Sequence, residues 1–366
     1  MRLQGTPQRP RLAFTLLIAA MAALAGTVFF LNVKTVPGET PNIGETKSTP
    51  PLDTPPSDIA MQKTTGNGDQ ASGRVIPPRT GMPSEGVGGA SDTSSQAVFE
   101  DTVQDRYFQT SDGIRLHYFL GGVQVPSART LVFITGWAMP AEIWWWQMRY
   151  FAPRFRVVAL DPRSQGRSDI AEEGHTPARR AQDIAELLKE LGGRPVVLVG
   201  WSLGVLEALS YVKDHGNAGL EALVLVDNSV GEEPPPEPTE FMRRYRKERE
   251  SGMRWFVREM FRTPQPEGFL EDLTRSALRI PMKQSLDLLN TLYPREVWRK
   301  ALYSVQVPLL YVVTSRFSEQ SENLNRKRPE TWTEVFPNAG HALFVDEEER
   351  FNLLLQRFLM AMEPTR

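Results

Sequence analysis

A single serine, Ser202, lies between two glycines at the point where an apolar run passes into a helix-like segment. The run is VVLVGWSLGVLEAL, from Val196 to Leu209. Its first half is typical of a buried strand, and its second half has helical spacing. A sharp strand-to-helix turn of the form G-x-S-x-G exposes the serine hydroxyl beside the free N–H groups of the helix N-terminus. The pattern predicts that Ser202 is a nucleophile, and the alternative is a serine that caps the helix.

A serine hydroxyl needs a neighbouring base before it can act as a nucleophile. The chain has only four histidines, at positions 117, 175, 215 and 341. His341 follows the last strand-like segment and precedes the final helix, which would place its imidazole on a loop at the same edge of the sheet as Ser202. The other three lie in a hairpin strand, in a loop before a helix, and at the far end of the helix that follows Ser202. His341 is therefore the predicted base, and a purely structural histidine is the alternative.

Two backbone N–H groups are expected to stabilise the oxyanion that a serine nucleophile creates. One belongs to Leu203, the residue after the nucleophile, and the other to Trp137, which follows the strand-like LVFIT segment. Backbone donors leave the tryptophan side chain free. Trp137 and the cluster Trp144–Trp146 would then either line an acyl pocket or belong to the core.

Short apolar segments that read as buried strands alternate with helical segments, and these elements must position the site. A hairpin is predicted at 106–122, further strands at 130–137, 155–161, 195–200, 220–227, 307–314 and 331–336, and helices at 141–151, 176–193, 203–213 and 346–362. Alternating strands and helices imply βαβ units and a mainly parallel sheet. No strand pattern occurs at about 229–304, so we expect a helical insertion there, over the ends of the strands.

The first 98 residues differ in composition from the rest of the chain. Arg2, Arg9 and Arg11 precede an uncharged run, Leu12–Leu31, that would span roughly 30 Å as a helix. Residues 1–31 are therefore predicted to be a membrane anchor, with a cleavable secretory signal as the alternative, and both place the remainder outside the cytoplasm. Residues 32–98, rich in Pro, Thr, Ser and Gly, should be a disordered linker, and residues 99–366 the folded domain.

Overall composition excludes several classes of function. Lys and Arg total 42 against 44 Asp and Glu, so there is no basic surplus that would suit nucleic acid. The absence of cysteine excludes disulfides, thiol nucleophiles and zinc sites built on thiolates. No cofactor or metal is needed for a serine nucleophile activated by histidine.

Four motifs give the chain a resemblance to the α/β-hydrolase superfamily, over about residues 106–358. They are TGWAMPAEIW, DPRSQGRSD, GWSLG and NAGHALFVDEEERF. The resemblance implies an α/β-hydrolase fold, with a mainly parallel eight-stranded sheet flanked by helices and a helical cap inserted after the sixth strand. The elbow and oxyanion loop are similar to those of pimeloyl-carrier-protein methyl ester esterases, but predicted export argues against that cytosolic substrate. Thr135 stands where the superfamily usually has the histidine of a His-Gly pair.

The acid of the expected Ser-His-acid triad does not follow the usual pattern of the superfamily. Most members carry an Asp in a turn after the seventh strand, and here that turn reads YVVTSRFSEQSE, without Asp. Asp227 ends the sixth strand, which is the second placement that the superfamily uses. A carboxylate there could orient His341 and stabilise the imidazolium. Asp227 is the predicted acid, with Glu319 in reserve; the alternative is that Asp227 only caps a turn.

The sequence therefore predicts a serine hydrolase that cleaves a small-molecule carboxylic ester through an acyl-enzyme, with a Ser202–His341–Asp227 triad. Its location would be the outer face of a membrane, such as a bacterial inner membrane facing the periplasm, or the periplasm or exterior after signal cleavage. Other activities of the superfamily remain open: an iminopeptidase, a haloperoxidase-like perhydrolase or a C–C bond hydrolase. A non-catalytic binding domain on a membrane tether is the alternative from a different class.

Overall fold

The computed structural model describes residues 99, 102–237 and 241–363. The predicted anchor and linker within residues 1–98 lie outside this part of the chain. No helix among the described residues is both long enough and apolar enough to cross a lipid bilayer.

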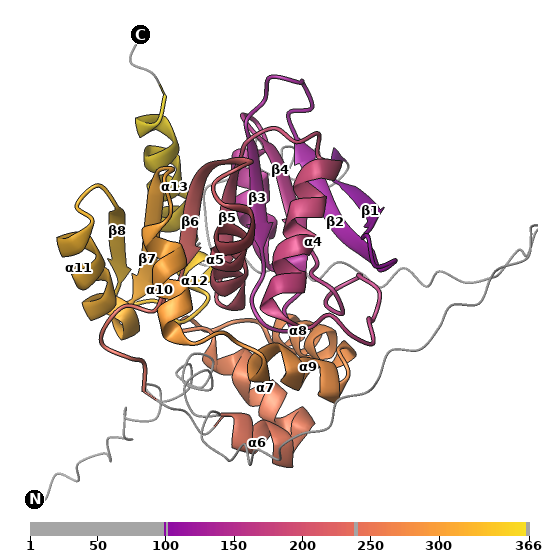
Figure 1. Ribbon diagram of the computed structural model, residues 1–366. Coiled ribbons are helices and arrows are strands. Elements are labelled where there is room, and N and C mark those ends of the chain that lie inside the picture. Colours follow the sequence, from indigo (N-terminus) through magenta and orange to yellow (C-terminus); the bar gives the residue numbers. More distant parts are fainter. Residues whose placement is uncertain (1–98, 100–101, 238–240, 364–366) are drawn as a thin grey trace, which may run out of the picture. The chain divides into compact units, whose positions relative to one another are not determined.

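The centre of the fold is one eight-stranded sheet with the order β1-β2-β4-β3-β5-β6-β7-β8 (Figure 1). The strands are β1 Gln104–Gln109, β2 Arg115–Gly122, β3 Thr130–Ile134, β4 Arg156–Leu160, β5 Val196–Trp201, β6 Leu220–Val226, β7 Leu309–Thr314 and β8 Trp332–Phe336. β2 pairs antiparallel with β1 and with β4, and every other pairing is parallel. The prediction of a mainly parallel eight-stranded sheet is confirmed.

The central strands are apolar because helices cover both faces of the sheet. All residues of β3, β5 and β7 are buried, whereas five of the six residues of the edge strand β1 are exposed. Strands buried on both faces read as continuous β-branched runs rather than as an alternation of apolar and polar residues. This is why the parallel strands were visible in the sequence.

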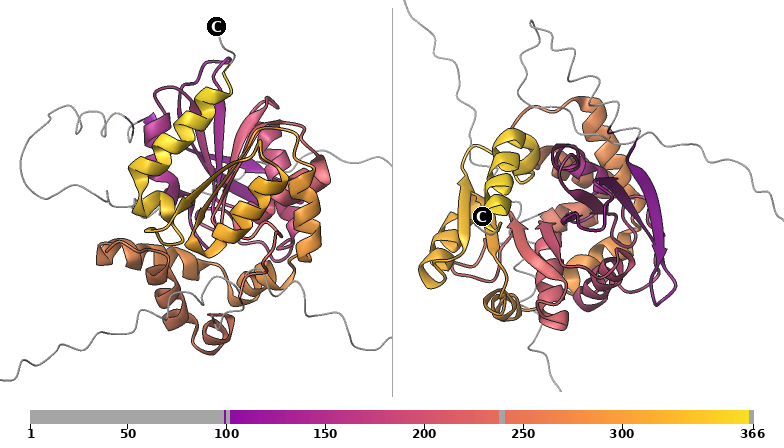
Figure 2. Two further views of the ribbon diagram at one scale, coloured as in Figure 1. Left: turned by 90° about the vertical axis from the view of Figure 1, so that its left-hand side faces the viewer. Right: turned by 90° about the horizontal axis from the view of Figure 1, so that it is seen from above.

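Two helical layers enclose the sheet. Helices α4 (Pro177–Glu190), α5 (Leu203–His215) and α10 (Arg295–Tyr303) pack side by side on one face. Helices α3 (Trp145–Phe151) and α13 (Glu348–Ala361) pack on the other face, and the left view of Figure 2 shows the sheet between the two layers. Helix α11 (Ser318–Lys327), preceded by the 3-10 turn η4 (Ser315–Phe317), lies between β7 and β8 in the chain and packs against both strands.

The cap is made of four helices beyond the carboxyl ends of the strands, at the bottom of Figure 1. They are α6 Phe241–Lys247, α7 Arg249–Glu259, α8 Glu267–Arg279 and α9 Met282–Asn290. The predicted insertion at about 229–304 also contains α10, but α10 packs against α5 and so belongs to a layer of the sheet. The cap proper is therefore shorter than the insertion.

Several element boundaries differ from the sequence-based expectation, and three of these differences lie near the site. The strand expected at 130–137 ends at Ile134, where the chain turns toward the site. The helix expected at 141–151 is a 3-10 turn, η3 (Ala141–Trp144), followed by α3. The helix expected at 346–362 begins at Glu348 as α13, and Asp346 instead ends the short helix α12 (Leu343–Asp346). The Asp346 carboxylate accepts main-chain bonds from the cap and from the preceding loop.

Candidate active site

Ser202 occupies a strained turn between β5 and α5. Its backbone has φ 56° and ψ −120°, a combination that L-residues rarely adopt. A side chain on Gly200 would come within 2.3 Å of the carbonyl oxygen of Gly204, and one on Gly204 would come within 2.7 Å of the carbonyl oxygen of Ile134. Both glycines are needed because the helix begins so close to the strands. The turn leaves Ser202 2% exposed at the carboxyl edge of the sheet.

The side chains of Ser202, His341 and Asp227 form a continuous hydrogen-bonded chain. Ser202 Oγ lies 2.8 Å from His341 Nε2, and His341 Nδ1 lies 2.7 Å from Asp227 Oδ2. A carboxylate can only accept hydrogen bonds, so Nδ1 carries the ring proton and the lone pair of Nε2 faces the serine. The arrangement can remove a proton from the hydroxyl and hold the resulting imidazolium beside a negative charge.

Asp227, which directly follows β6, is held by the neighbouring strand β7. The backbone N–H and the hydroxyl of Thr314, at the end of β7, donate to Asp227 Oδ1 at 2.7 and 2.8 Å. The backbone of Asp227 has φ 49°, so this residue also lies in the left-handed region. Glu319, the reserve acid, is exposed in the first turn of α11, and the position beside His341 Nδ1 is filled by Asp227.

Tyr311 and Asn228 hold the turn after β6 beneath this carboxylate. The Tyr311 hydroxyl donates to the carbonyl oxygen of Asn228 at 2.8 Å, and the Asn228 amide donates to the carbonyl oxygen of Ser202 at 2.8 Å. Burial, together with the negative charges of Asp227 and Glu232, raises the pKa of Tyr311 well above 10. Tyr311 therefore stays a neutral donor.

The two residues expected to supply oxyanion N–H groups both adjoin Ser202. Leu203 is the first residue of α5. Trp137 follows Gly136, and a Cβ on Gly136 would lie 2.9 Å from the Cβ of Ser202, so this peptide packs directly against the serine. Their assignment as oxyanion donors remains a prediction.

The side chain of Trp137 attaches the cap rather than facing an open pocket. Its indole N–H donates to the carbonyl oxygen of Ser285 in α9 at 2.8 Å. Its ring also packs edge-on against Phe241, Tyr245 and Phe256 of α6 and α7, with centroids 5.2–5.4 Å apart. The residues Trp144–Trp146 are buried in the core, as the second interpretation of the aromatic cluster expected.

The loop that carries His341 is held from two sides. The indole N–H of Trp201 donates to the carbonyl oxygen of His341 at 2.9 Å. On the other side, Asp346 Oδ2 accepts the N–H groups of Gly340 and of Arg262, which lies between α7 and α8, both at 2.7 Å. The cap and the histidine loop are thus joined through one buried carboxylate.

The remaining histidines lie elsewhere. His117 is buried in β2 with Nδ1 2.7 Å from Asp161 Oδ2, and His215 stacks on Tyr211 at the end of α5. His175 Nε2 contacts Ser164 Oγ at 2.9 Å. Burial and the nearby Arg180 and Arg163 lower the pKa of His175 to about 4, so it is neutral at physiological pH.

Sequence reasoning missed Trp201, Thr314 and Asp346, which position the three central side chains. Each acts on a residue distant in the chain, and the contacts of Trp201, Thr314 and Asp346 span 140, 87 and 84 positions. The sequence offered one usable indication: Thr314 ends the strand after which the superfamily usually places its acid.

The fold, the strained turn and the hydrogen-bonded chain are those of a hydrolase. Residues 131–352 match the model of the alpha/beta hydrolase family, and the chain therefore belongs to this family of enzymes. The predicted resemblance and fold class are confirmed.

Individual relatives are similar over shorter or more divergent stretches. The chain is 35% identical over 121 residues, 33% of its own length, to a non-heme haloperoxidase of Rhodococcus erythropolis and to a bifunctional esterase/perhydrolase of Acinetobacter calcoaceticus. Each of these matches spans 43% of the relative's length. An esterase structure from Exiguobacterium antarcticum has a similar fold, with TM-score 0.62 and 22% identity, over 70% of this chain and 100% of that one.

Proposed function

We propose that the protein is a serine carboxylesterase that uses Ser202 as nucleophile, His341 as general acid and base, and Asp227 to orient the imidazole. The observation that carries this proposal is the chain of two hydrogen bonds, 2.8 and 2.7 Å long, that connects these three side chains. A serine that only capped its helix would need neither a strained backbone nor a histidine at its hydroxyl. The same observation favours an enzyme over a binding domain.

The reaction would proceed in two steps. His341 Nε2 takes the hydroxyl proton while Ser202 Oγ adds to the ester carbonyl, and the negative oxygen that forms faces the N–H groups of Trp137 and Leu203. The imidazolium then returns the proton to the alcohol, which leaves behind a Ser202 acyl ester. Water, deprotonated by His341, repeats the attack and releases the acid and the free serine.

The cap lies beyond the carboxyl ends of the strands, so a substrate would have to reach Ser202 between α6–α9 and the sheet. Because Trp137 is both the proposed oxyanion donor and the residue on which α6, α7 and α9 pack, a change in cap position would act directly on the site. A cap of this kind limits substrate size and excludes water during the acyl-enzyme stage.

A fluorophosphonate probe and a graded series of p-nitrophenyl esters test the proposal. We expect the probe to label the full-length chain once, and Ser202→Ala to abolish both labelling and ester turnover. A wild-type chain that is folded but neither labelled nor active would overturn the proposed activity. The ester series would identify the acyl length that the site accepts.

Perhydrolysis is a second candidate because one relative is named as both esterase and perhydrolase. In that reaction hydrogen peroxide replaces water, attacks the Ser202 acyl ester and leaves as a peracid, while the serine regains its proton through His341. Peracid formation from ester and peroxide, lost in Ser202→Ala, would support it.

We also propose that residues 1–31 anchor the enzyme in a membrane, with the catalytic domain outside the cytoplasm and residues 32–98 as the tether. The support is the uncharged Leu12–Leu31 run after Arg2, Arg9 and Arg11. Fractionation of the expressed chain and the mass of its N-terminus test this. A mature chain that begins near Gly26 would favour a cleaved signal instead.

A further inference from the structure

We infer that Gln165 is a positioning residue for the oxyanion hole and that a buried pair, Arg180 and Glu207, holds Gln165 in place. The inference rests on the proposed function, because it assigns to these residues the task of aiming the N–H of Trp137. Gln165 lies in the loop after β4, and its side chain is buried.

The Gln165 amide donates hydrogen bonds to the main chain of the loop that contains Trp137, the proposed oxyanion donor. Its Nε2 donates to the carbonyl oxygen of Gly136 at 2.9 Å and to that of Met139 at 3.0 Å, and it lies 3.3 Å from the hydroxyl of Thr135. These contacts bracket Ala138, whose φ of 60° is unusual for a residue with a side chain. The hydrogen bonds from Gln165 therefore stabilise a strained turn of the main chain.

The bond to Gly136 fixes the direction of the next N–H group. In a planar trans peptide the carbonyl and the N–H point in opposite directions. Since the carbonyl of Gly136 points to Gln165, the N–H of Trp137 points away from Gln165. The same peptide packs against Ser202. Rotation of this peptide would turn the N–H of Trp137 away from its proposed task, and Gln165 opposes that rotation.

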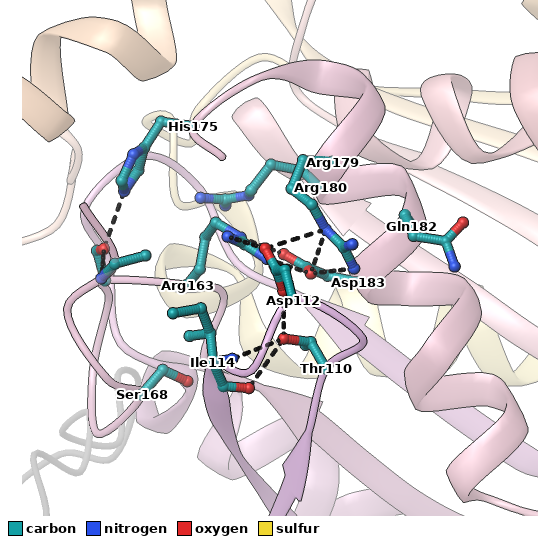
Figure 3. A network of polar contacts seen from close by, with 12 residues as sticks. Thr110, Asp112, Ile114, Arg163, Ser168, His175, Arg179, Arg180, Gln182 and Asp183 are labelled. Atoms are coloured by element: carbon teal, nitrogen blue, oxygen red, sulfur yellow. Dashed lines mark hydrogen bonds and ion pairs between the residues drawn. The ribbon is translucent and has the colours of Figure 1, made fainter. Parts of the chain in front are cut away.

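The loop that carries Gln165 is bonded to neighbouring elements, and Figure 3 shows the contacts of its arginine, Arg163. Arg163 donates to Asp183 through Nε and Nη2, both at 2.7 Å, and to Asp112 through Nη1 at 3.0 Å. Ser164, the next residue, contacts His175. Arg163 and Ser164, the two residues before Gln165, are thus both bonded to neighbouring elements. These bonds hold the backbone from which the Gln165 side chain extends.

Arg180 and Glu207 set the orientation of the Gln165 amide. Arg180 Nη2, from α4, donates to Gln165 Oε1 at 3.4 Å and lies 2.5 Å from Glu207 Oε1, one turn beyond the start of α5. Both side chains are almost fully buried, and burial raises the pKa of Glu207 to about 7. Because the guanidinium can only donate, the Gln165 oxygen must face it and the NH₂ group must face the loop.

This arrangement gives a physical role to Thr135, which stands where the superfamily usually has a histidine. The Thr135 hydroxyl donates to the carbonyl oxygen of Met139 at 2.9 Å, and Gln165 Nε2 donates to that same carbonyl. Threonine and glutamine together thereby close the turn over residues 135–139.

The test compares ester substrates with thionoesters, in which sulfur replaces the carbonyl oxygen that the hole binds. Sulfur is a poor hydrogen-bond acceptor, so preference for the oxygen ester measures the oxyanion hole. We expect Gln165→Leu to lower kcat/KM on the oxygen ester by about 10- to 100-fold, part of the 10²–10³ that loss of a whole donor costs. The thionoester rate should fall much less. Glu207→Gln should also lower the preference for the oxygen ester over the thionoester, but by a smaller factor.

Gln147→Leu is the matched control. Gln147 is another buried glutamine whose Nε2 donates to a main-chain carbonyl, that of Phe344, at 2.8 Å, but it lies in α3 on the other face of the sheet. It should leave the oxygen-to-sulfur preference unchanged. If Gln165→Leu is active and keeps the wild-type preference for the oxygen ester, the inference about Gln165 is wrong while the proposed function still stands. A wild type that is neither labelled by fluorophosphonate nor active on esters overturns the proposed function and the inference with it.

Discussion

Trp201, the neighbour of Ser202, binds the backbone of His341, whose imidazole lies against the Ser202 hydroxyl. The indole N–H of Trp201 donates to the carbonyl oxygen of His341 at 2.9 Å, and the two rings lie 5.2 Å apart. The strand that precedes Ser202 is therefore also bonded to the loop that carries His341. Strand and loop are 140 positions apart, so this bond sets their spacing independently of the Ser202–His341 contact.

Trp201→Phe should lower kcat by about tenfold, equivalent to about 1.4 kcal/mol, and leave KM nearly unchanged. Phenylalanine keeps most of the apolar contact but cannot donate to His341, so the imidazole samples more orientations. Steady-state kinetics on a p-nitrophenyl ester measure the effect. Trp332→Phe, at a tryptophan 40% exposed on β8, is the control. Equal kinetics for the two variants would show that the bond does not position the base.

The identity of the acid can be tested by two substitutions that each remove one negative charge. Asp227→Asn should lower kcat on the order of 10⁴-fold, because an amide at this position favours the wrong tautomer of His341. Glu319→Gln should leave kcat unchanged, since Glu319 is exposed on α11. A large loss in Glu319→Gln together with an active Asp227→Asn would reverse the assignment.

Local sequence patterns predicted the strands and the strand-to-helix turn at Ser202 because the information is local. The run before Ser202 is buried on both faces, and the glycines at positions 200 and 204 are required by distances of 2.3 and 2.7 Å to main-chain atoms. The contact between Asp227 and His341 could be predicted because parallel strands end at one edge, which brings the residue after β6 close to the loop after β8.

The residues that position the site could not be predicted in this way. Asp346 has the appearance of a helix-starting acid in the sequence, yet its carboxylate binds main-chain N–H groups at 262, 263 and 340. Gln165 lies inside a turn-rich motif in which no periodicity marks a buried side chain. Their roles depend on contacts between distant loops, and a pattern along one segment does not contain that information.

The strain at Ser202 predicts a difference between two inactive variants. Ser202→Gly should be more stable than Ser202→Ala by about 1 kcal/mol, because glycine adopts φ near 56° without steric cost whereas alanine keeps the strain. Both lack the hydroxyl, so loss of the bond to His341 cancels in the comparison. Urea unfolding followed by tryptophan fluorescence gives the two free energies. A Ser202→Ala variant as stable as Ser202→Gly would mean that the strain is no larger than the extra conformational entropy that glycine loses on folding.

His175 should make stability depend on pH. Its pKa is lowered to about 4 in the folded chain by burial and by the charges of Arg180 and Arg163, against about 6.5 when unfolded. Between these values the unfolded chain binds more protons, so folding stability is lost as pH falls from about 6.5 toward 4, by up to about 1.4 kcal/mol per unit from this residue. His175→Gln should flatten that part of the curve. Parallel curves for wild type and variant would contradict the assignment.

Asp346 offers a way to uncouple the cap from the histidine loop. Its carboxylate accepts the N–H groups of Gly340, Arg262 and Thr263, and the Thr263 hydroxyl at 2.5 Å. In Asp346→Asn one oxygen becomes an NH₂ donor that faces donors, so the contact between the α7–α8 connection and the loop opens.

We expect Asp346→Asn to raise KM and lower kcat together, each several-fold, and to speed proteolytic cleavage between α7 and α8. Cap position and histidine position would both become less defined, whereas loss of a purely local contact would affect the cleavage rate alone. Asp287→Asn is the control, since Asp287 lies in the same cap and pairs only with Lys283 at the surface among the ion pairs of the described residues. Kinetics and limited trypsin digestion of wild type, Asp346→Asn and Asp287→Asn test this prediction. If kcat and KM of Asp346→Asn match those of wild type despite faster cleavage, the cap does not position His341.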